Sequence, residues 1–301
     1  MANLRISGEH TVLAFGPDMK AVATAENGSI IEFETLDCFA NQITDASQRM
    51  ADIDETNANP ATGPVYINGA EPGDTLKVEI LKMELGPVAV ACEIPGEGVT
   101  GQVVNVESVK VMQVADGICH FSDDMQLPLN PMIGVIGTAN SKEWVNTETP
   151  DYHGGNLDCI RIGEGATLYL PVMVEGALLG MGDLHACMGD GEVGVSGAEI
   201  PGLVTVRVTV LKDCKLPLPF VVNDDLCATM CSCVTLDEAA DRAVLQMRDF
   251  LMECCGVPSE DAGMLMSLSG DLRINQVVNP KKTCRMELPM AVIRKLGYTF
   301  E

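Results

Sequence analysis

Short runs of alternating apolar and polar residues dominate the first 220 positions of the chain. Residues 204–210 (VTVRVTV) alternate strictly, and residues 76–83 (LKVEILKM) alternate over most of their length. A period of two is that of a strand with one buried face. Residues 168–174 form a more continuous apolar run that Pro171 interrupts, and they predict a further short strand.

Turn-forming dipeptides separate these runs. Asn-Gly, Asp-Gly and Pro-Gly pairs favour tight turns. They stand at residues 27–28, 68–69, 72–73, 95–96 and 116–117. Short strands divided by frequent turns predict a β-sandwich or a β-barrel, and the 29 glycines and 16 prolines agree with that class.

The pattern changes to a helical one near residue 235. The segment Thr235-Leu-Asp-Glu238 has the form of a capping box, in which the Thr hydroxyl caps the helix and an acid stands three residues later. Apolar residues follow at helical spacing until Gly256 and Pro258 provide a stop. A helix over residues 237–254 is therefore predicted.

Two further helices are predicted near the C-terminus, over residues 260–269 and over residues 288–296. The fold class is then mainly β (α+β), with a few helices towards the C-terminus. We expect a β-rich portion over residues 1–150. A second β-rich portion, over residues 151–301, would carry the candidate site and the helices, and the two would pack as one interleaved unit.

Composition and charge limit the classes of partner. Apolar residues make up 47% of the 301 residues and aromatic residues only 4%, so the core is expected to be aliphatic. Lys and Arg number 19 against 43 Asp and Glu, which gives a formal net charge of −24. Binding to phosphate-rich partners needs clustered basic residues. We therefore expect neither a nucleic-acid partner nor a membrane partner.

The cysteines suggest a reducing compartment. No basic segment followed by an apolar run opens the chain, and no stretch of 18 apolar residues occurs, so a cytoplasmic location is expected. Twelve cysteines would stay reduced there. A thiolate zinc site around Cys227, Cys231 and Cys233 is one interpretation. No CxxC pair occurs, however, and buried thiols that act as small apolar side chains are the favoured interpretation.

The most polar histidine segment is Gly-Asp-Leu-His-Ala-Cys-Met-Gly-Asp-Gly-Glu, residues 182–192. Asp183 and His185 are two residues apart, so on a strand both point to one face. Asp190 and Glu192 have the same spacing, and the segment could present three carboxylates and an imidazole to one point. Such a donor set suits zinc, manganese or a similar divalent ion.

A second segment, His153-Gly-Gly-Asn-Leu-Asp158, has related features. Asn156 and Asp158 share a face if the chain is extended, and the two glycines leave room for a close ligand. A hydrogen-bonded His–Asp pair without metal, and ordinary glycine turns, are the alternative for both segments.

Other signals are weaker. His10 and His120 are expected on the surface. No GxSxG elbow and no Walker loop is present. Residues 189–194 spell GxGxxG, but they carry two acids and no amphipathic helix follows, which makes a dinucleotide site a poor interpretation.

Six segments, taken in order, resemble those of the acetamidase/formamidase family. They are residues 32–39, 59–70, 131–139, 153–158, 182–192 and 270–280. The resemblance covers essentially the whole chain. It implies hydrolysis of small linear carboxamides, such as formamide and acetamide, to ammonia and the carboxylic acid. It also implies a jelly-roll-like β-sandwich with a small β-barrel portion, and a homodimer or higher homo-oligomer.

The resemblance further implies a bound divalent metal, for which we expect zinc, with calcium as a candidate second ion. Carried onto this sequence, the ligands would be Asp158, Asp183 and His185, with Asp37 and Glu192 as candidates nearby. Cys187 would add a soft donor close to the histidine and could alter the preference for a metal.

These residues suggest a mechanism for amide hydrolysis. Glu192 is expected to act as general base and then as general acid, with Glu71 in reserve. His153 and Asn156 are expected to donate hydrogen bonds to the developing oxyanion.

Two alternatives stay open. A hydrolase of γ-lactams or of other C–N bonds within the same family would share this site. A non-catalytic metal-binding β-sandwich module is less expected, because sugar-binding modules present aromatic side chains and this chain has one Trp, four Tyr and seven Phe.

Overall fold

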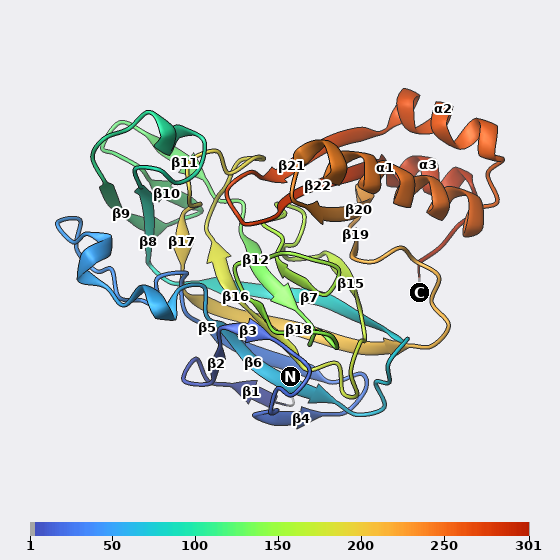
Figure 1. Cartoon of the computed structure of the whole chain (residues 1–301), viewed down its shortest axis with the longest axis horizontal. Coiled ribbons are helices and arrows are strands. Elements are labelled where there is room, and N and C mark those ends of the chain that lie inside the picture. The colour runs from blue at the N-terminus through green and yellow to red at the C-terminus, as the bar shows by residue number, and fades with distance from the viewer. Residues whose placement is uncertain (1–3, 301) are drawn as a thin grey trace.

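The computed structural model describes residues 4–300, and most of their regular structure is β-strand (Figure 1). Two large open sheets, of nine and eleven strands, pack against each other over a shared aliphatic core, and a two-stranded sheet lies beside them. The prediction of a mainly β fold is therefore confirmed.

The nine-stranded sheet runs in spatial order through β1 (Leu4–Ile6), β5 (Ile30–Thr35), β18 (Gly202–Leu211), β7 (Thr75–Leu85), β15 (Thr167–Pro171), β19 (Phe220–Val222), β20 (Leu226–Cys233), β22 (Lys282–Pro289) and β21 (Asp271–Gln276). The eleven-stranded sheet runs through β11 (Gln126–Pro128), β10 (Ile118–His120), β9 (Ser108–Ala115), β8 (Val88–Glu93), β17 (Glu199–Ile200), β16 (Leu179–His185), β12 (Met132–Gly137) and β14 (Gly154–Asn156). Three more of its strands lie off this path: β6 (Ala61–Ile67), which pairs with β16, and β2 (Thr11–Val12) and β4 (Ala23–Ala25), which pair with β6. The small sheet joins β3 (Ala14–Phe15) to β13 (Val145–Asn146).

Neither large sheet closes on itself within residues 4–300. In the spatial order of strands, β1 and β21 form the two edges of the first sheet, and β11 and β14 end the main path of the second. The small barrel portion that we expected is therefore wrong for the described part of the chain. Both sheets combine strands from before and after residue 150. The division of the chain near that residue stays a prediction.

The alternation seen in the sequence accounts for the nine-stranded sheet. In β18 the side chains at 204, 206, 208 and 210 are buried, and their neighbours are partly exposed. They pair with the predicted strand over residues 76–83, which the structure extends to 75–85. Pro171 is the last residue of β15 and so shortens the predicted strand. At the predicted turn between β9 and β10, Asp116 and Gly117 have φ of 52° and 79°, as a two-residue type I′ hairpin requires.

Strand β16 differs from these, because all seven of its residues are buried. It lies inside the eleven-stranded sheet between β12 and β17, and it also pairs with β6. A strand that is covered on both faces can hold polar side chains away from water. The candidate site is built on β16 and its neighbours.

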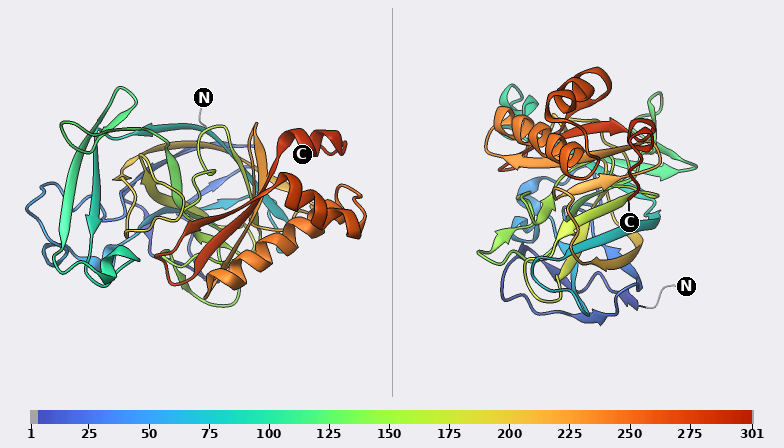
Figure 2. Two further views of the ribbon diagram at one scale, coloured as in Figure 1. Left: turned by 90° about the horizontal axis from the view of Figure 1, so that it is seen from above. Right: turned by 90° about the vertical axis from the view of Figure 1, so that its right-hand side faces the viewer.

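Helices α1 (Leu236–Glu253), α2 (Ser259–Ser269) and α3 (Met290–Lys295) gather at one end of the nine-stranded sheet (Figures 1 and 2). Thr235 caps α1 by accepting a hydrogen bond from the Glu238 amide, as predicted. The third helix is shorter than expected, because residues 288–289 complete β22. Three short 3₁₀ helices complete the structure: η1 (Met50–Asp52), η2 (Glu55–Asn57) and η3 (Thr100–Gln102). None of the helices in the described residues has the length and apolar character needed to span a membrane.

Candidate metal centre

A buried cluster of acidic side chains surrounds His185 at the end of β16. Asp183 lies two residues earlier on the same strand, and its Oδ1 is 3.5 Å from His185 Nε2. The expectation that these two side chains share a face is therefore confirmed. Glu199, on the neighbouring strand β17, is directly opposite His185, with its Oε2 3.1 Å from Nε2. Asp158, just after β14, brings Oδ1 to 4.0 Å from the same nitrogen.

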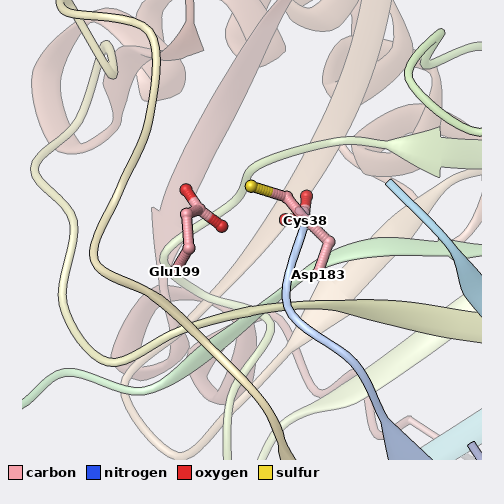
Figure 3. Close-up of side chains that lie close together, drawn as sticks. All are labelled: Cys38, Asp183 and Glu199. Atoms are coloured by element: carbon pink, nitrogen blue, oxygen red, sulfur yellow. The ribbon is translucent and has the colours of Figure 1, made fainter. Parts of the chain in front are cut away.

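Two sets of potential metal ligands can be drawn from this region. The first consists of Asp158, His185 and Glu192, and the second of Cys38, Asp183 and Glu199. Within each set, one donor atom from every residue lies within 4.8 Å of the others. Figure 3 shows the second set, with the Cys38 sulfur directed towards the Glu199 carboxylate. The sets adjoin, because His185 is in contact with both Asp183 and Glu199.

Unusual backbone conformations accompany the candidate ligands. Asp158, Asp183 and Glu192 have φ of 42°, 56° and 42°, in the left-handed region that residues other than glycine rarely adopt. Such strain persists only where surrounding structure enforces it, and it is common at functional sites. The backbone here is bent to aim the carboxylates inwards.

Two glycines leave the space that the cluster occupies. A Cβ on Gly134 would lie 2.5 Å from Asp183 Oδ2 and 2.8 Å from Asp158 Oδ1. A Cβ on Gly197 would lie 2.4 Å from His185 Nδ1. All three distances are far below van der Waals contact, so any other residue would displace the candidate ligands.

Amide side chains hold the carboxylates from the outside. Asn279 donates from Nδ2 to Asp158 Oδ2 over 2.6 Å. With its amide nitrogen towards the carboxylates, Asn156 donates to Asp158 Oδ1 over 2.8 Å and to Asp183 Oδ2 over 3.1 Å. Its oxygen then accepts from Asn59 and Asn279. Asn156 thus orients the candidate ligands, and its amide is engaged with them.

Arg285 fixes the loop that carries Glu192. This fully buried guanidinium forms two hydrogen bonds of 2.7 Å with Asp190, and it donates to Asn275 Oδ1 over 2.8 Å. Asn275 in turn binds the carbonyl of Leu157, next to Asp158. The expectation that Asp190 joins Glu192 around one point is therefore wrong, because Arg285 holds the Asp190 carboxylate.

Too little positive charge faces the cluster to balance its acids. Asp158, Asp183, Glu192 and Glu199 are all at most 7% exposed. One oxygen each of Asp183, Glu192 and Glu199 has no hydrogen-bond partner. A buried carboxylate without a partner costs several kcal/mol, on the order of 3–5. His185 is the basic side chain within 4 Å of them, and Arg285 is engaged elsewhere.

Burial and repulsion between the carboxylates both raise the pKa values of the acids in this cluster. Burial, with the charge of Asp183 added, raises the pKa of Asp158 to about 6. Burial also raises the pKa of Glu199 to about 8, although His185 opposes the shift. The pKa of Glu192 is well above its ordinary value because of burial and the Asp158 charge. Burial alone would lower the pKa of His185, but Glu199 and Asp183 raise it well above its usual range.

The donor chemistry and the unpartnered oxygens fit a divalent cation. Carboxylate and imidazole donors suit zinc and similar ions, and a positive charge would satisfy the oxygens that lack hydrogen bonds. A His–Asp pair without metal accounts poorly for four buried acids around one imidazole.

Several residues considered from the sequence lie outside both sets. Asp37 accepts hydrogen bonds from the amides of Phe39 and Asn41, and so shapes its own turn. His153 packs against Phe15, with ring centroids 5.4 Å apart, and neither ring nitrogen has a partner. Glu71 is exposed and pairs with Lys212.

The expected soft donor is also a different residue. Cys187 lies outside both sets, and Cys38 supplies the sulfur instead. Cys231 and Cys233 place their sulfurs 3.9 Å apart, but Cys227 and Cys233 belong to different apolar clusters. No metal set forms around these three thiols in the described residues. His10 and His120 are exposed, as expected.

Glu199 was missed in the sequence. It lies 14 residues after His185 along the chain, in a two-residue strand, and only the pairing register of β16 with β17 brings the two side chains together. The family resemblance includes the segment that contains Cys38 but implies no role for its thiol. A sequence without pairing information carries no signal for either.

Two cavities lie on either side of the cluster. One, of about 620 Å³, is lined by Cys38, Asn59 and Asn279 among others. The other, of about 550 Å³, is reached by Glu192, and its wall includes the apolar side chains of Met112 and Leu127. Both cavities are large enough for a small organic substrate.

Comparison with known proteins agrees with this picture. The sequence matches the acetamidase/formamidase family over residues 7–150 and 144–295. The fold is similar to that of an acetamidase from Bacillus halodurans, at 44% identity, with 98% of this chain and 100% of the other covered and a TM-score of 0.96. It is similarly close to a predicted acetamidase/formamidase from the thermophile Thermoanaerobacter tengcongensis, at 41% identity, 99% coverage of both chains and a TM-score of 0.96.

A curated relative, the acetamidase of Mycolicibacterium smegmatis, is 27% identical over an alignment that covers 65% of this chain and 64% of the relative. The chain spans 63–64% of the length of the curated relatives it matches.

Proposed function

The chain belongs to the acetamidase/formamidase family, and from that premise we propose that it hydrolyses small linear carboxamides of the formamide or acetamide type. The products would be ammonia and the carboxylic acid. We further propose that the reaction depends on a divalent cation, with zinc as the expected ion and calcium as a candidate second ion.

One observation carries the proposal of a cation. Four carboxylates converge on His185 in the protein interior, and three of their oxygens have no hydrogen-bond partner. Buried charges are normally paired or bound to metal. A cation bound among these carboxylates would balance their charge and contact the oxygens that lack a hydrogen-bond partner.

Asp158, Asp183 and His185 would hold this first cation, as the resemblance implies. Their donor atoms lie around His185 Nε2 at 3.5–4.0 Å. When bound, such an ion polarises a carbonyl group and makes water acidic enough to supply a nucleophile near neutral pH.

Glu192 would act as the general base and then as the general acid of the reaction. Its Oε2 has no hydrogen-bond partner, and the residue reaches the wall of the 550 Å³ cavity. A carboxylate at the boundary between a buried cluster and a cavity can take a proton from water and return it to the leaving nitrogen. Burial and the Asp158 charge raise the pKa of Glu192, which favours its taking up a proton.

Asn156 would act as a positioning residue instead of an oxyanion donor, because its amide nitrogen is directed at Asp158 and Asp183. An oxyanion role for His153 has no contact to support it, since its ring faces Phe15. The acyl part of the substrate would lie against Met112 and Leu127 in the cavity that Glu192 reaches.

We also propose a cytoplasmic location and a homodimer or higher homo-oligomer, both from the family resemblance. Light scattering of the purified protein measures the oligomeric state directly. The large negative charge is compatible with small neutral amides, since it neither attracts nor repels them.

The proposal is tested with a panel of amides and γ-lactams after elemental analysis of the purified protein. Release of ammonia from formamide or acetamide, together with loss of turnover on chelation and recovery with zinc, is the expected result. Ring opening of lactams without ammonia release would instead select the lactam alternative. A protein that contains metal but converts no substrate on the panel would contradict the proposed activity.

A further inference from the structure

We propose that Cys38, Asp183 and Glu199 form a second cation position that adjoins the first, so that the cluster is a two-metal site with one thiolate ligand. This inference rests on the proposed function, because the first cation is the one held by Asp158, Asp183 and His185, and Asp183 would contribute to both positions. The class of ion is a thiophilic divalent cation such as zinc or cobalt.

The three donors converge from three separate parts of the fold. Cys38 follows strand β5, Asp183 lies on β16 and Glu199 on β17. One donor atom of each lies within 4.8 Å of the others, and the Cys38 sulfur is directed at the Glu199 carboxylate (Figure 3). The fold as a whole holds donors from distant segments in position, more firmly than it holds donors that are neighbours on one loop.

Unpartnered oxygens point independently to a ligand at this position. Asp183 and Glu199 are each only 2% exposed. Asp183 Oδ1 and Glu199 Oε2 have no hydrogen-bond partner. The other oxygen of Glu199 accepts from the Gly197 amide over 2.7 Å. The carboxylate is therefore held in place with one oxygen left for another partner.

The contact with His185 supplies a charge partner only when the imidazole is protonated. Glu199 Oε2 is 3.1 Å from His185 Nε2, which is an ion-pair distance, and this oxygen has no hydrogen bond of good geometry. Two atoms that bind one small cation at about 2.0 Å each are typically separated by about 3 Å without bonding to one another. The spacing is thus compatible with His185 and Glu199 as neighbouring ligands in one metal cluster.

The turn that carries Cys38 is fixed on both sides. The Asp37 carboxylate accepts from the amides of Phe39 and Asn41. The carbonyl of Cys38 itself accepts from the Asn59 amide over 2.8 Å. Asp37, which was expected to be a ligand, thus supports the residue next to it.

The donor set selects the ion. Thiolate donors favour zinc, cobalt and other soft ions, whereas magnesium and calcium prefer oxygen donors alone. Burial and the neighbouring carboxylates disfavour a free thiolate at Cys38, whereas a bound cation favours that form. Cys38 also lines the 620 Å³ cavity, which offers the ion a route from solvent.

The test uses the full chain, depleted of metal with a chelator and titrated with cobalt(II). The wild type should bind two equivalents of cobalt and develop thiolate-to-cobalt charge-transfer absorption in the near ultraviolet. Cys38→Ser should bind one equivalent and lose that absorption. Cys92→Ser is the matched control, because Cys92 lines the same cavity but lies outside both ligand sets, and it should keep both equivalents and the absorption.

The outcomes separate this inference from the proposed function. One equivalent in the wild type, without the charge-transfer absorption, would overturn the second position and leave the first intact. No cobalt binding at all would overturn both. If Cys38→Ser lost turnover but kept two equivalents, Cys38 would act as a nucleophile and the second position would be wrong. Even if Cys38→Ser does not fold, the wild-type cobalt spectrum tests whether a thiolate binds the second cation.

Discussion

His185 and Glu199 stand directly opposite each other on the antiparallel strands β16 and β17, with Nε2 and Oε2 3.1 Å apart. Residues opposite each other in a sheet project to the same face, and this register is set by the pairing of the whole strand. Glu199 is therefore brought into the cluster by backbone pairing, and its Gly197 contact fixes the carboxylate.

Replacing Glu199 with Gln should weaken metal binding by at least about tenfold, since even the loss of a partner close to a metal ligand costs tenfold to a hundredfold. The substitution keeps the shape but removes a charge beside His185. Isothermal titration with zinc measures the effect. Glu84→Gln, at an exposed ion pair with Lys82, is the control and should bind as the wild type does. Equal affinities in both variants would contradict the role of Glu199.

Replacing Glu192 with Gln should lower kcat by about 10²- to 10⁴-fold, the usual contribution of a general acid–base group. Zinc content should stay unchanged if Glu192 moves the proton and is not an essential ligand. Initial-rate kinetics with formamide, paired with elemental analysis, measure both. Glu71→Gln is the control, because Glu71 is exposed and pairs with Lys212. Retained turnover in Glu192→Gln, or lost turnover in Glu71→Gln, would reverse the assignment.

Adding one methyl group at Gly134 should disrupt the centre. In Gly134→Ala the new Cβ would fall 2.5 Å from Asp183 Oδ2 and 2.8 Å from Asp158 Oδ1, so both carboxylates must move. We expect zinc affinity to fall at least about tenfold and turnover to fall with it. Gly263→Ala, in helix α2, meets nothing within 4 Å and should bind zinc normally. Unchanged zinc affinity in Gly134→Ala would show that these carboxylates are not ligands.

The periodicity of the sequence was sufficient to place Asp183 and His185 on one face and to predict the cap of α1. It does not predict the partner of Asp190. Asp190 lies two residues from Glu192, and this spacing predicts that the two carboxylates face one point. Arg285, 95 positions later, binds the Asp190 carboxylate instead. Glu199 depends on strand register in the same way. Local spacing reports which side chains share a face, whereas charge partners and register are set by segments far along the chain.

Removing the ion pair between Arg285 and Asp190 should affect the candidate metal centre, although neither residue is a proposed metal ligand. Asp190→Asn removes the charge from a bidentate pair whose guanidinium is fully buried. We expect a loss of about 2 kcal/mol in the free energy of unfolding, the range for hydrogen bonds to charged groups. Because the Glu192 loop is then held less firmly, kcat should fall more than KM changes. Urea unfolding and formamide kinetics measure the two effects.

The control for that variant is Asp271→Asn, at an exposed pair with Arg273 on β21. Exposed ion pairs contribute little, so its stability should change by less than about 1 kcal/mol. A loss of stability in Asp190→Asn without any change in the kcat of the remaining folded protein would show that Arg285 supports the fold but does not position Glu192.

Stability of the metal-free protein should fall as pH rises from about 6.5 to 8. In this range the pKa of Glu199 is raised to about 8 by burial, and that of His185 is raised well above its usual value by Glu199 and Asp183. The folded state therefore holds more protons than the unfolded state, so the free energy of unfolding has a negative slope against pH. The contribution is fully present below the unfolded pKa values and is lost as pH passes through the folded ones.

Saturating zinc should reverse the sign of that slope, because ligands must lose protons before they bind metal and affinity then rises with pH. Urea unfolding with and without zinc across this range measures both slopes. Glu199→Gln should flatten the metal-free profile, since it removes one shifted group and the charge that raises the pKa of His185. A metal-free protein that gains stability between pH 6.5 and 8 would mean that these acids are already balanced by charge within the protein, and the argument for a cation would fail.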